Sequence, residues 1–393
     1  MHRRILGSIA LLLATSIGCE ALAEVPPSLL AARRAKSDAT LSLLTYQHIN
    51  QLFETEPVKA GPNVWTLEHS ALSLQKFTYT YNGKTYAWAD FPERTKANAV
   101  IVLKDGKIVS EIYRNGSGPD TRFIAYSMSK SVTSVLTGLA VADGLIKVDD
   151  QVVAHIPELK GTAYDGVTIR NLLMMRSGVD WTEAYAPGTE LDKVRDGSTN
   201  QAVQYYEDYA FKATRATAPG SRFNYSTLDA GVLGWALERA VKRPIPEYMS
   251  DRLWTLAGME FDGYWMKEGP EGKERPWFGA GFNSTLRDFA RFGQLMVDGG
   301  KAQNRQVVPS SWVDQTTSNT DHSNYMWLWW PIAGVEGGFS GRGTYGQALF
   351  ADRTNNTVIV AFSYWPANAD NAQISEEQAS VFKQVSEALR VSR

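Results

Sequence analysis

Two residues that could perform nucleophilic chemistry, Ser127 and Lys130, lie three positions apart where a helix is predicted to begin. From Val132 onward the apolar residues recur with the period of a helix that buries one face, and Gly144 is placed to end that helix. Three residues span nearly one turn of helix, which brings the serine hydroxyl and the lysine amine onto one face, within possible hydrogen-bond reach. The spacing therefore predicts a nucleophile beside a base.

The predicted position of Lys130 favours an uncharged amine. A lysine near a helix N-terminus faces the positive end of the helix dipole, and shielding from water also disfavours its charged form, so we expect its pKa to fall toward neutrality. A neutral amine can take the proton of Ser127. The backbone N–H of Ser127 lies in the first turn, where N–H groups lack helical partners, and could bind an oxyanion that develops on a substrate.

The Ser-x-x-Lys spacing alone identifies no site. It also occurs at Ser73 and Lys76, within an alternating run typical of a strand, and at Ser380 and Lys383, on the terminal helix. A capped, solvent-exposed helix start is the alternative interpretation of such a serine. Whether Ser127 is a catalytic serine or the start of a solvent-exposed helix must therefore be judged from the sequence around it.

Strand patterns dominate the first part of the chain after a helical start. Residues 26–53 are polar and amphipathic, and we expect one helix laid across the outside of the fold. Residues 64–90 alternate around an Asn82-Gly83 turn, and residues 99–113 flank an Asp105-Gly106 turn. Each of these two patterns predicts a β-hairpin.

A helical middle is followed by a return to strands. Within it, helices are predicted over residues 167–175, 230–241 and 246–256. Beyond it, amphipathic helices are predicted over residues 286–297 and 375–390, and strands over residues 326–331, 343–351 and 357–364.

Strands at both ends of the chain bracket this helical middle. We therefore expect an α+β fold, in which an antiparallel β-sheet flanked by helices carries an inserted, mostly helical domain. The sheet domain would comprise residues 24–150 and 286–393, and the helical domain residues 151–285.

The composition argues against several other classes of protein. The 393 residues are 44% hydrophobic and can bury a large core, while a net charge of −2 gives no electrostatic case for binding nucleic acid. No Gly-x-Ser-x-Gly sequence occurs, which argues against an α/β-hydrolase. The histidines show no metal-binding spacing, so we expect no metal and no cofactor, and surface or loop positions for His2, His48, His69, His155 and His322.

The N-terminus has the pattern of a secretory signal peptide. Residues 1–23 begin with basic residues, continue with an apolar run over 5–17 and end in Ala21-Leu22-Ala23, a small-x-small cleavage site. The apolar run is too short to span a bilayer, and no later segment qualifies. Cleavage after Ala23 would remove the only cysteine, Cys19, whose lipid attachment is the weaker alternative. We therefore expect a periplasmic or secreted protein without a membrane span.

A serine–lysine pair without histidine needs a second group to protonate a leaving group. Tyrosine is the expected residue type when a nearby lysine lowers its pKa. Residues 219–227 form a predicted loop that opens onto a helix, and this loop contains Tyr225.

The mature chain, with Ser127, Lys130 and Tyr225 in this order, resembles the penicillin-recognising serine hydrolases of class C β-lactamase type. Four pieces carry the resemblance, in the order found in that family: Ser127-Met128-Ser129-Lys130, residues 144–152, residues 167–178, and residues 219–227. The resemblance implies that Ser127 is the acylated nucleophile, Lys130 its base partner and Tyr225 the catalytic tyrosine.

The chain departs from the family pattern at two places. Thr227 replaces the usual asparagine of the Tyr-x-Asn element, and the Lys-Thr-Gly strand has no match, with residues 343–347 in its place. The resemblance implies a substrate contact at Thr344 and a second oxyanion donor in the backbone N–H of Tyr345, or of Thr344 in a shifted register. Without the lysine of that strand, we expect weak recognition of a β-lactam carboxylate.

This variant pattern resembles the branch that contains 6-aminohexanoate-dimer hydrolases and related esterases. Residues 177–185 are similar to the stretch whose tyrosine closes over substrate, which nominates Tyr185 for substrate binding; a loop tyrosine packed on Trp181 is the alternative. Trp327 and Trp329 alternate on a predicted strand and share a face, so Trp329 could line the cleft or pack in the core.

The expected function is that of an exported serine hydrolase acting on a small amide or ester, with no nucleic-acid partner and an unspecified oligomeric state. A β-lactamase or a D-alanyl-D-alanine peptidase would use the same residues. A non-hydrolytic sensor of penicillin type, whose acylated serine never releases product, is the alternative from another class.

Overall fold

The computed structural model describes residues 25–318, 325–367 and 370–391. The predicted leader with Cys19, and His2 and His322 among the histidines, lie outside the described residues. Within them, no helix is both long enough and apolar enough to cross a membrane.

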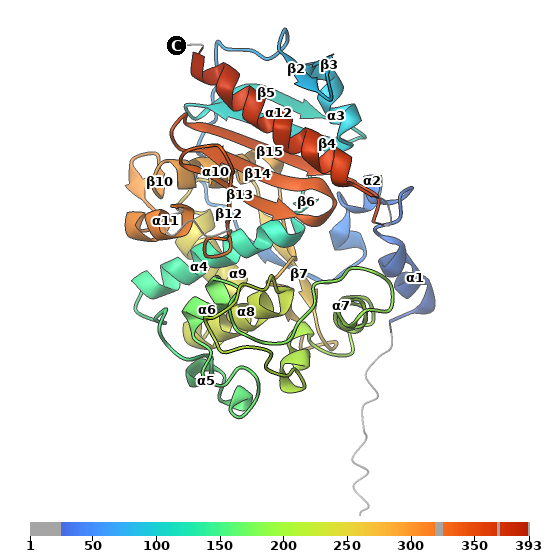
Figure 1. The fold of residues 1–393 in the computed structure, drawn as a ribbon, viewed down its shortest axis with the longest axis vertical. Coiled ribbons are helices and arrows are strands. Elements are labelled where there is room, and N and C mark those ends of the chain that lie inside the picture. The colour runs from blue at the N-terminus through green and yellow to red at the C-terminus, as the bar shows by residue number, and fades with distance from the viewer. Residues whose placement is uncertain (1–24, 319–324, 368–369, 392–393) are drawn as a thin grey trace, which may run out of the picture.

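A six-stranded antiparallel sheet unites the two ends of the chain (Figure 1). Its strand order is β12-β13-β14-β15-β4-β5. The central pairing joins the first half of the chain to the last, with Val360 of β15 opposite Ile101 of β4. The strands are β4 (Ala97–Lys104), β5 (Lys107–Tyr113), β12 (Trp330–Pro331), β13 (Gly338–Gly343), β14 (Gln347–Asp352) and β15 (Thr357–Ser363). The predicted α+β class is confirmed.

Helices cover both faces of this sheet, because its central strands are apolar on both sides. Val100 and Val102 face the apolar side of α12 (Ala372–Val391), where Phe382 and Val385 lie. The alternate residues of β4 face α10 (Leu286–Val297) in the main core of the molecule. The predicted helices over 286–297 and 375–390 are therefore confirmed, one on each face.

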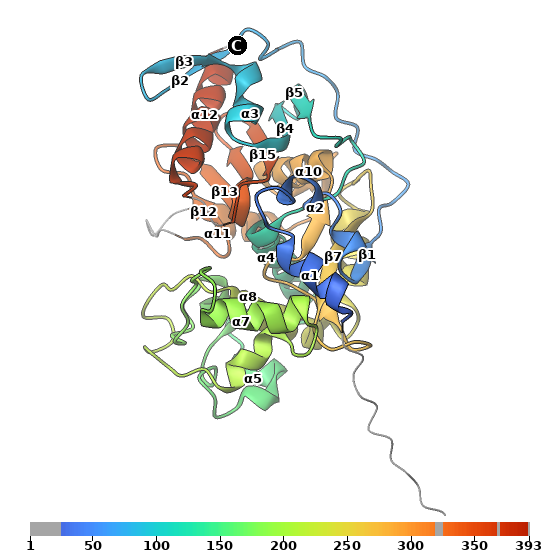
Figure 2. The same cartoon turned by 90° about the vertical axis from the view of Figure 1, so that its right-hand side faces the viewer.

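A layer of helices lies below the sheet (Figure 2), and α4 is its member nearest to the sheet (Figure 1). Its members are α4 (Ser129–Ala142), α5 (Val152–His155), α6 (Ile169–Leu173), α7 (Glu190–Arg195), α8 (Thr227–Val241) and α9 (Ile245–Met249). The region predicted as mostly helical also contributes strands to a second sheet, which the sequence patterns missed. That sheet is built from β1 (Thr55–Val58), β6 (Phe123–Ile124), β7 (Gly263–Glu268), β8 (Arg275–Pro276) and β9 (Phe282–Ser284).

Both predicted hairpins are present, and the remaining elements are short. The Asn82-Gly83 turn joins β2 (Thr78–Tyr81) to β3 (Lys84–Ala87), and the Asp105-Gly106 turn joins β4 to β5. Short elements elsewhere include α3 (Phe91–Arg94), β10 (Lys301–Ala302), β11 (Arg305–Gln306) and α11 (Ser310–Thr317). The domain boundaries expected from the sequence stay a prediction.

Three predicted elements are broken in the structure. The expected helix over 26–53 is divided into α1 (Pro27–Ala35), α2 (Ser42–Thr45) and the 3-10 turn Ile49–Gln51. The expected strand over 343–351 is the end of β13, a turn, and most of β14. The expected strand over 326–331 is a tight turn before β12, because Trp327 and Leu328 take left-handed backbone angles, with φ of 37° and 71°.

Candidate active site

Ser127 lies in a short 3-10 turn, Tyr126–Met128, which leads directly into α4. The sequence pattern predicted Ser127 in the first turn of the α-helix itself, whereas the helix begins two residues later, at Ser129. Tyr126 has a φ of 44°, and this left-handed residue makes the sharp bend between β6 and α4. The bend brings Ser127 to the wall of a cavity of about 400 Å³.

Lys130 is almost fully buried, with 1% of its surface exposed, and its amine contacts three oxygens. The Nζ atom lies 2.9 Å from Ser127 Oγ, 3.0 Å from Thr227 Oγ1 and 2.8 Å from the carbonyl oxygen of Gly279. Burial lowers the pKa of Lys130 to about 8, while the negative charge of Glu183 acts in the opposite direction. About a tenth of the amine is therefore uncharged at pH 7, and about half at pH 8.

The three contacts orient the amine when it is neutral. The carbonyl of Gly279 can only accept a hydrogen bond. The Thr227 hydroxyl donates its hydrogen to Glu183, so its oxygen accepts from Lys130. These two acceptors engage both N–H groups of a neutral amine, and the lone pair is left pointing at the hydroxyl of Ser127. This geometry suits removal of the serine proton.

Tyr225 lies in the loop before α8, and its side chain forms a hydrogen bond with that of Ser127. Lys130 Nζ is 5.1 Å from the centre of its ring, and Trp330 packs against the ring with the centroids 5.4 Å apart. Burial raises the pKa of Tyr225, contrary to the expectation that a nearby lysine would lower it. The phenol is therefore protonated at neutral pH and is suited to donate a proton.

Glu183 is the residue that the sequence analysis missed. Its carboxylate accepts hydrogen bonds from Trp181 Nε1 at 2.6 Å, from the Tyr185 hydroxyl at 2.8 Å and from the Thr227 backbone N–H at 2.9 Å, besides the Thr227 hydroxyl. The alternation Trp181-x-Glu183-x-Tyr185 was the available signal, since it places these three side chains on one side of an extended segment. Tyr185 itself lines the cavity and is 41% exposed.

The turn of residues 344–346 lies beside Ser127. Gly343 pairs with Gln347 where β13 and β14 meet. A Cβ atom at Gly343 would lie 3.2 Å from the backbone nitrogen of Ser127 and 2.4 Å from the carbonyl oxygen of Ala125, so this close approach requires glycine. Thr344 and Tyr345 both line the cavity, and Tyr345 is left-handed, with a φ of 63°.

Trp329, nominated for substrate binding, does not line the cavity. It is fully buried and packs against Phe292 and Phe339, with ring centroids 5.9 and 5.3 Å apart. The turn at Trp327 removes the alternation on which the nomination was based, and Trp330 is the tryptophan that contacts Tyr225. Of the two interpretations left open for Trp329, core packing is correct.

The other candidates lie away from this cavity. Ser73 and Lys76 are exposed residues of a loop, and Ser380 and Lys383 lie on α12, across the sheet from α10. Among the described residues there is no group of three or more histidine, cysteine, aspartate or glutamate side chains that could hold a metal.

The fold and this site together define a class. An antiparallel sheet flanked by helices, with a buried serine and lysine where a central helix begins, is the architecture of the β-lactamase/transpeptidase-like serine hydrolases. The chain belongs to the beta-lactamase family, whose model, described as Beta-lactamase, matches residues 89–381. It is a hydrolytic enzyme of that superfamily.

Individual proteins of known name are similar over most of the chain. A 6-aminohexanoate-dimer hydrolase from Paenarthrobacter ureafaciens is 30% identical over 319 residues, which are 76% of this chain and 80% of the relative. A solved structure from Bacillus anthracis, assigned as a 6-aminohexanoate-dimer hydrolase, superposes with a TM-score of 0.81 at 24% identity, covering 90% of this chain and 96% of that one. EstCE1, a hydrolase with promiscuous acyltransferase activity, superposes with a TM-score of 0.61 at 15% identity, covering 76% and 99%.

Proposed function

We propose that the protein is an exported serine hydrolase that cleaves small amides or esters through an acyl-enzyme on Ser127. The observation that carries this proposal is the 2.9 Å contact between Lys130 Nζ and Ser127 Oγ, with the two other oxygens around Nζ engaged as acceptors. Export rests on the leader pattern of residues 1–23. The mass of the mature protein from a periplasmic extract would test cleavage after Ala23.

Acylation begins when Lys130 takes the proton of Ser127 and the serine oxygen attacks the carbonyl carbon of the substrate. The backbone N–H groups of Ser127 and Tyr345 bind the oxyanion that forms. Tyr225 donates its proton to the departing amine or alcohol as the bond to the carbonyl carbon breaks, and the proton on Lys130 then replaces the one that Tyr225 lost. The acyl group remains on Ser127 as an ester.

Deacylation reverses these proton movements with water in place of the leaving group. Water attacks the ester carbonyl and gives one proton to Tyr225 as Tyr225 passes its own proton to Lys130. Lys130 then returns this proton to Ser127 as the bond between the serine oxygen and the carbonyl carbon breaks and the carboxylic acid leaves. Tyr185 and Thr344, which line the cavity, are placed to contact the substrate.

A linear amide or ester is the preferred substrate class. This preference is supported by the relative named 6-aminohexanoate-dimer hydrolase, which is similar to most of the chain. A β-lactamase or D-alanyl-D-alanine peptidase is the second candidate, favoured by the family description. Against it, the turn beside Ser127 carries Thr344 and Tyr345 and no lysine for a β-lactam carboxylate.

Intact-mass analysis across a substrate panel tests the proposal. Wild-type protein and Ser127→Ala would be incubated with p-nitrophenyl esters, linear amides and nitrocefin. We expect an acyl adduct and turnover of esters or amides by the wild type only. Rapid turnover of nitrocefin with slow ester hydrolysis would favour the β-lactamase, and stoichiometric labelling without turnover of any ester or amide would favour a sensor.

A further inference from the structure

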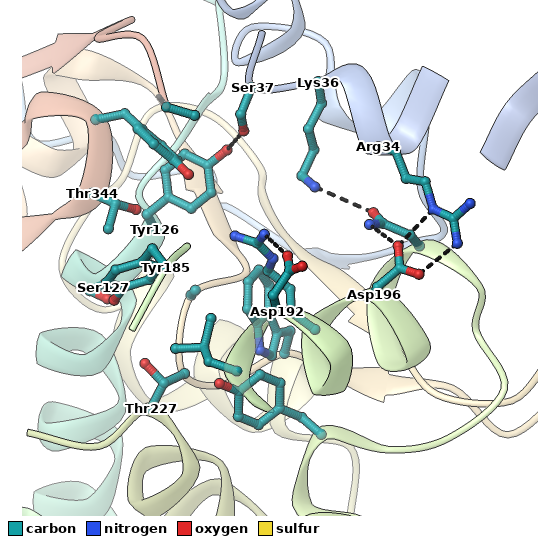
Figure 3. Close-up of a pocket in the computed structure, with 18 of the residues that line it drawn as sticks. Arg34, Lys36, Ser37, Tyr126, Ser127, Tyr185, Asp192, Asp196, Thr227 and Thr344 are labelled. Atoms are coloured by element: carbon teal, nitrogen blue, oxygen red, sulfur yellow. Dashed lines mark hydrogen bonds and ion pairs between the residues drawn. The ribbon is translucent and has the colours of Figure 1, made fainter. Parts of the chain in front are cut away.

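The end of the cavity away from Ser127 is rich in charge. Figure 3 shows Ser127 and Thr227 on one side of the cavity and Arg34, Lys36 and Asp196 on the other. The cavity as a whole is lined by four basic and four acidic residues, so its net charge does not decide which ligand it suits. The basic residues are Arg34, Lys36, Lys193 and Arg195, and the acidic ones are Asp38, Glu183, Asp192 and Asp196. The hydrogen bonds of each group decide instead.

Three of the four acids are already satisfied by the protein. Asp196 accepts from Arg34 at 2.9 and 2.6 Å, and also from the side chains of Asn200 and Gln201. Asp192 accepts from Arg195 at 2.8 Å and from the backbone of Gly188 at 2.9 Å. Glu183 has the four donors described above. The fourth acid, Asp38, is exposed to solvent.

Two of the basic groups are not satisfied. Lys36, at the end of α1, is 6% exposed, and its amine has two long polar contacts, 3.3 Å to the carbonyl oxygen of Arg33 and 3.4 Å to Asn200 Oδ1. It also lies over the ring of Phe53, 5.3 Å from the ring centre, but a ring cannot replace an anionic acceptor. Arg195 donates to Asp192, but its Nε atom is buried without a partner among the described residues. This pair of cations therefore lacks a strong acceptor. Because a buried donor left unpaired is costly, an acceptor supplied by a ligand would stabilise both groups.

We propose that Lys36 and Arg195 form a subsite for a carboxylate, so that the preferred substrate carries an anionic group besides the amide or ester that Ser127 attacks. A carboxylate at this end of the cavity would accept from the Lys36 amine beside the guanidinium of Arg195, and its charge would offset the repulsion between the two cations. This inference rests on the proposed function, since it concerns the substrate of the same cavity.

The charges around Lys36 give the subsite a pH dependence. Burial and the positive charges of Arg195 and Arg33 lower the pKa of Lys36 to about 7, against the opposing effect of Asp196 and Asp192. Lys36 is therefore charged below about pH 7 and loses its charge above it. The preference for a carboxylate should fall as the pH rises through this value, and a purely structural lysine would show no such effect.

Matched pairs of esters test the subsite. The first pair places the carboxylate in the acyl part of the ester and compares mono-p-nitrophenyl adipate with p-nitrophenyl hexanoate. The second pair places the carboxylate in the leaving group and compares 6-butanoyloxyhexanoate with hexyl butanoate. We expect the anionic member of at least one pair to have a kcat/KM about 10- to 100-fold higher at pH 6, because hydrogen bonds to charged groups are among the stronger ones. The ratio within a pair is independent of the amount of folded enzyme.

Lys36→Met should reduce that ratio to near one and abolish its pH dependence. Lys193→Met is the matched control, because Lys193 is 63% exposed and pairs with Glu190, so the same charge is lost outside the subsite. The subsite would be overturned by equal kcat/KM values within both pairs. It would also be overturned if the wild type preferred p-nitrophenyl 6-aminohexanoate, which is cationic, over the anionic adipate ester, or if Lys193→Met reduced the ratio as much as Lys36→Met. Hydrolysis of neutral esters without preference would overturn the subsite alone, whereas failure to hydrolyse any ester or amide would overturn the proposed function as well.

Discussion

The amine of Lys130 lies 3.0 Å from the hydroxyl oxygen of Thr227, and this hydroxyl is itself committed as a donor to Glu183. The direction of the Thr227 hydrogen bond makes the threonine an acceptor for Lys130. It therefore helps to turn the lone pair of a neutral lysine toward Ser127. The threonine that replaces the family asparagine performs this task with a single hydroxyl.

Replacement of Lys130 should abolish most of the activity whether or not a positive charge remains. We expect Lys130→Met and Lys130→Arg each to lower kcat/KM for a p-nitrophenyl ester by about 100- to 10,000-fold, because neither side chain can act as a base near neutral pH. Steady-state kinetics would measure the effect. Substantial activity in Lys130→Arg would mean that the amine acts through its charge and not as a base.

The charge of Glu183 should set the pH at which the enzyme becomes active. Glu183 raises the pKa of Lys130, which burial has lowered to about 8, so Glu183→Gln should move the rise of kcat/KM to lower pH. Tyr185→Phe is the matched control, because it removes one hydrogen bond to Glu183 but keeps the charge. A pH–rate profile of the three proteins would measure this. An unchanged inflection in Glu183→Gln would refute the coupling.

Tyr225→Phe should affect poor leaving groups most. The phenol donates a proton to the departing amine of an amide, whereas p-nitrophenolate leaves without one. We expect a loss of about 100-fold for an anilide and less than about tenfold for a p-nitrophenyl ester. Phenylalanine retains the packing on Trp330, so the fold should persist. Equal losses on both substrates would assign Tyr225 another role.

The approach of Gly343 to Ser127 predicts a sharp difference between two glycines of one strand. In Gly343→Ala the new methyl group would meet backbone atoms of Ala125 and Ser127, which cannot move aside as a side chain can. We expect kcat to fall about 10- to 100-fold as the turn is displaced. In Gly341→Ala the closest atom is the Ser131 hydroxyl oxygen at 3.3 Å, and a smaller effect is expected. Similar kcat values for both variants would contradict the placement of the turn.

Asp229 should make the wild-type protein less stable as the pH rises. Burial raises its pKa from 3.8 to about 7, although Tyr164 donates to it at 2.9 Å. Between these values the native state holds a proton that the unfolded state has lost, so stability falls with increasing pH. Urea unfolding at pH 5 and pH 8 should show that Asp229→Asn gains about 2 kcal/mol relative to wild type over this interval. A pH-independent difference between the two proteins would contradict the raised pKa.

Local spacing predicted the parts of the molecule that depend on near neighbours in the chain. Ser127 and Lys130 are three residues apart, so their contact follows from one turn of backbone. The Asp105-Gly106 turn and the apolar strand patterns predicted the strands that join the two ends of the chain. The turn at Trp327 and Leu328 escaped detection, because an apolar run contains no glycine or asparagine to mark left-handed residues.

Residues whose roles depend on tertiary contacts could not be found in this way. Glu183 acquires its role from Thr227, which is 44 positions further along the chain. Lys36 and Arg195 line the same cavity, although they come from helices at opposite ends of the first half of the chain. The sequence marks each as an ordinary charged residue, and only the fold reveals which of them lacks a partner.

The most direct test of the central claim is the rate constant for acylation of Ser127 as a function of pH, followed by intact mass after rapid mixing with a p-nitrophenyl ester. A neutral Lys130 acting as the base predicts a single inflection near pH 8, with faster acylation on the alkaline side and no adduct on Ser127→Ala. An acylation rate that stays constant from pH 6 to pH 10, or an adduct that persists in Ser127→Ala, would contradict it.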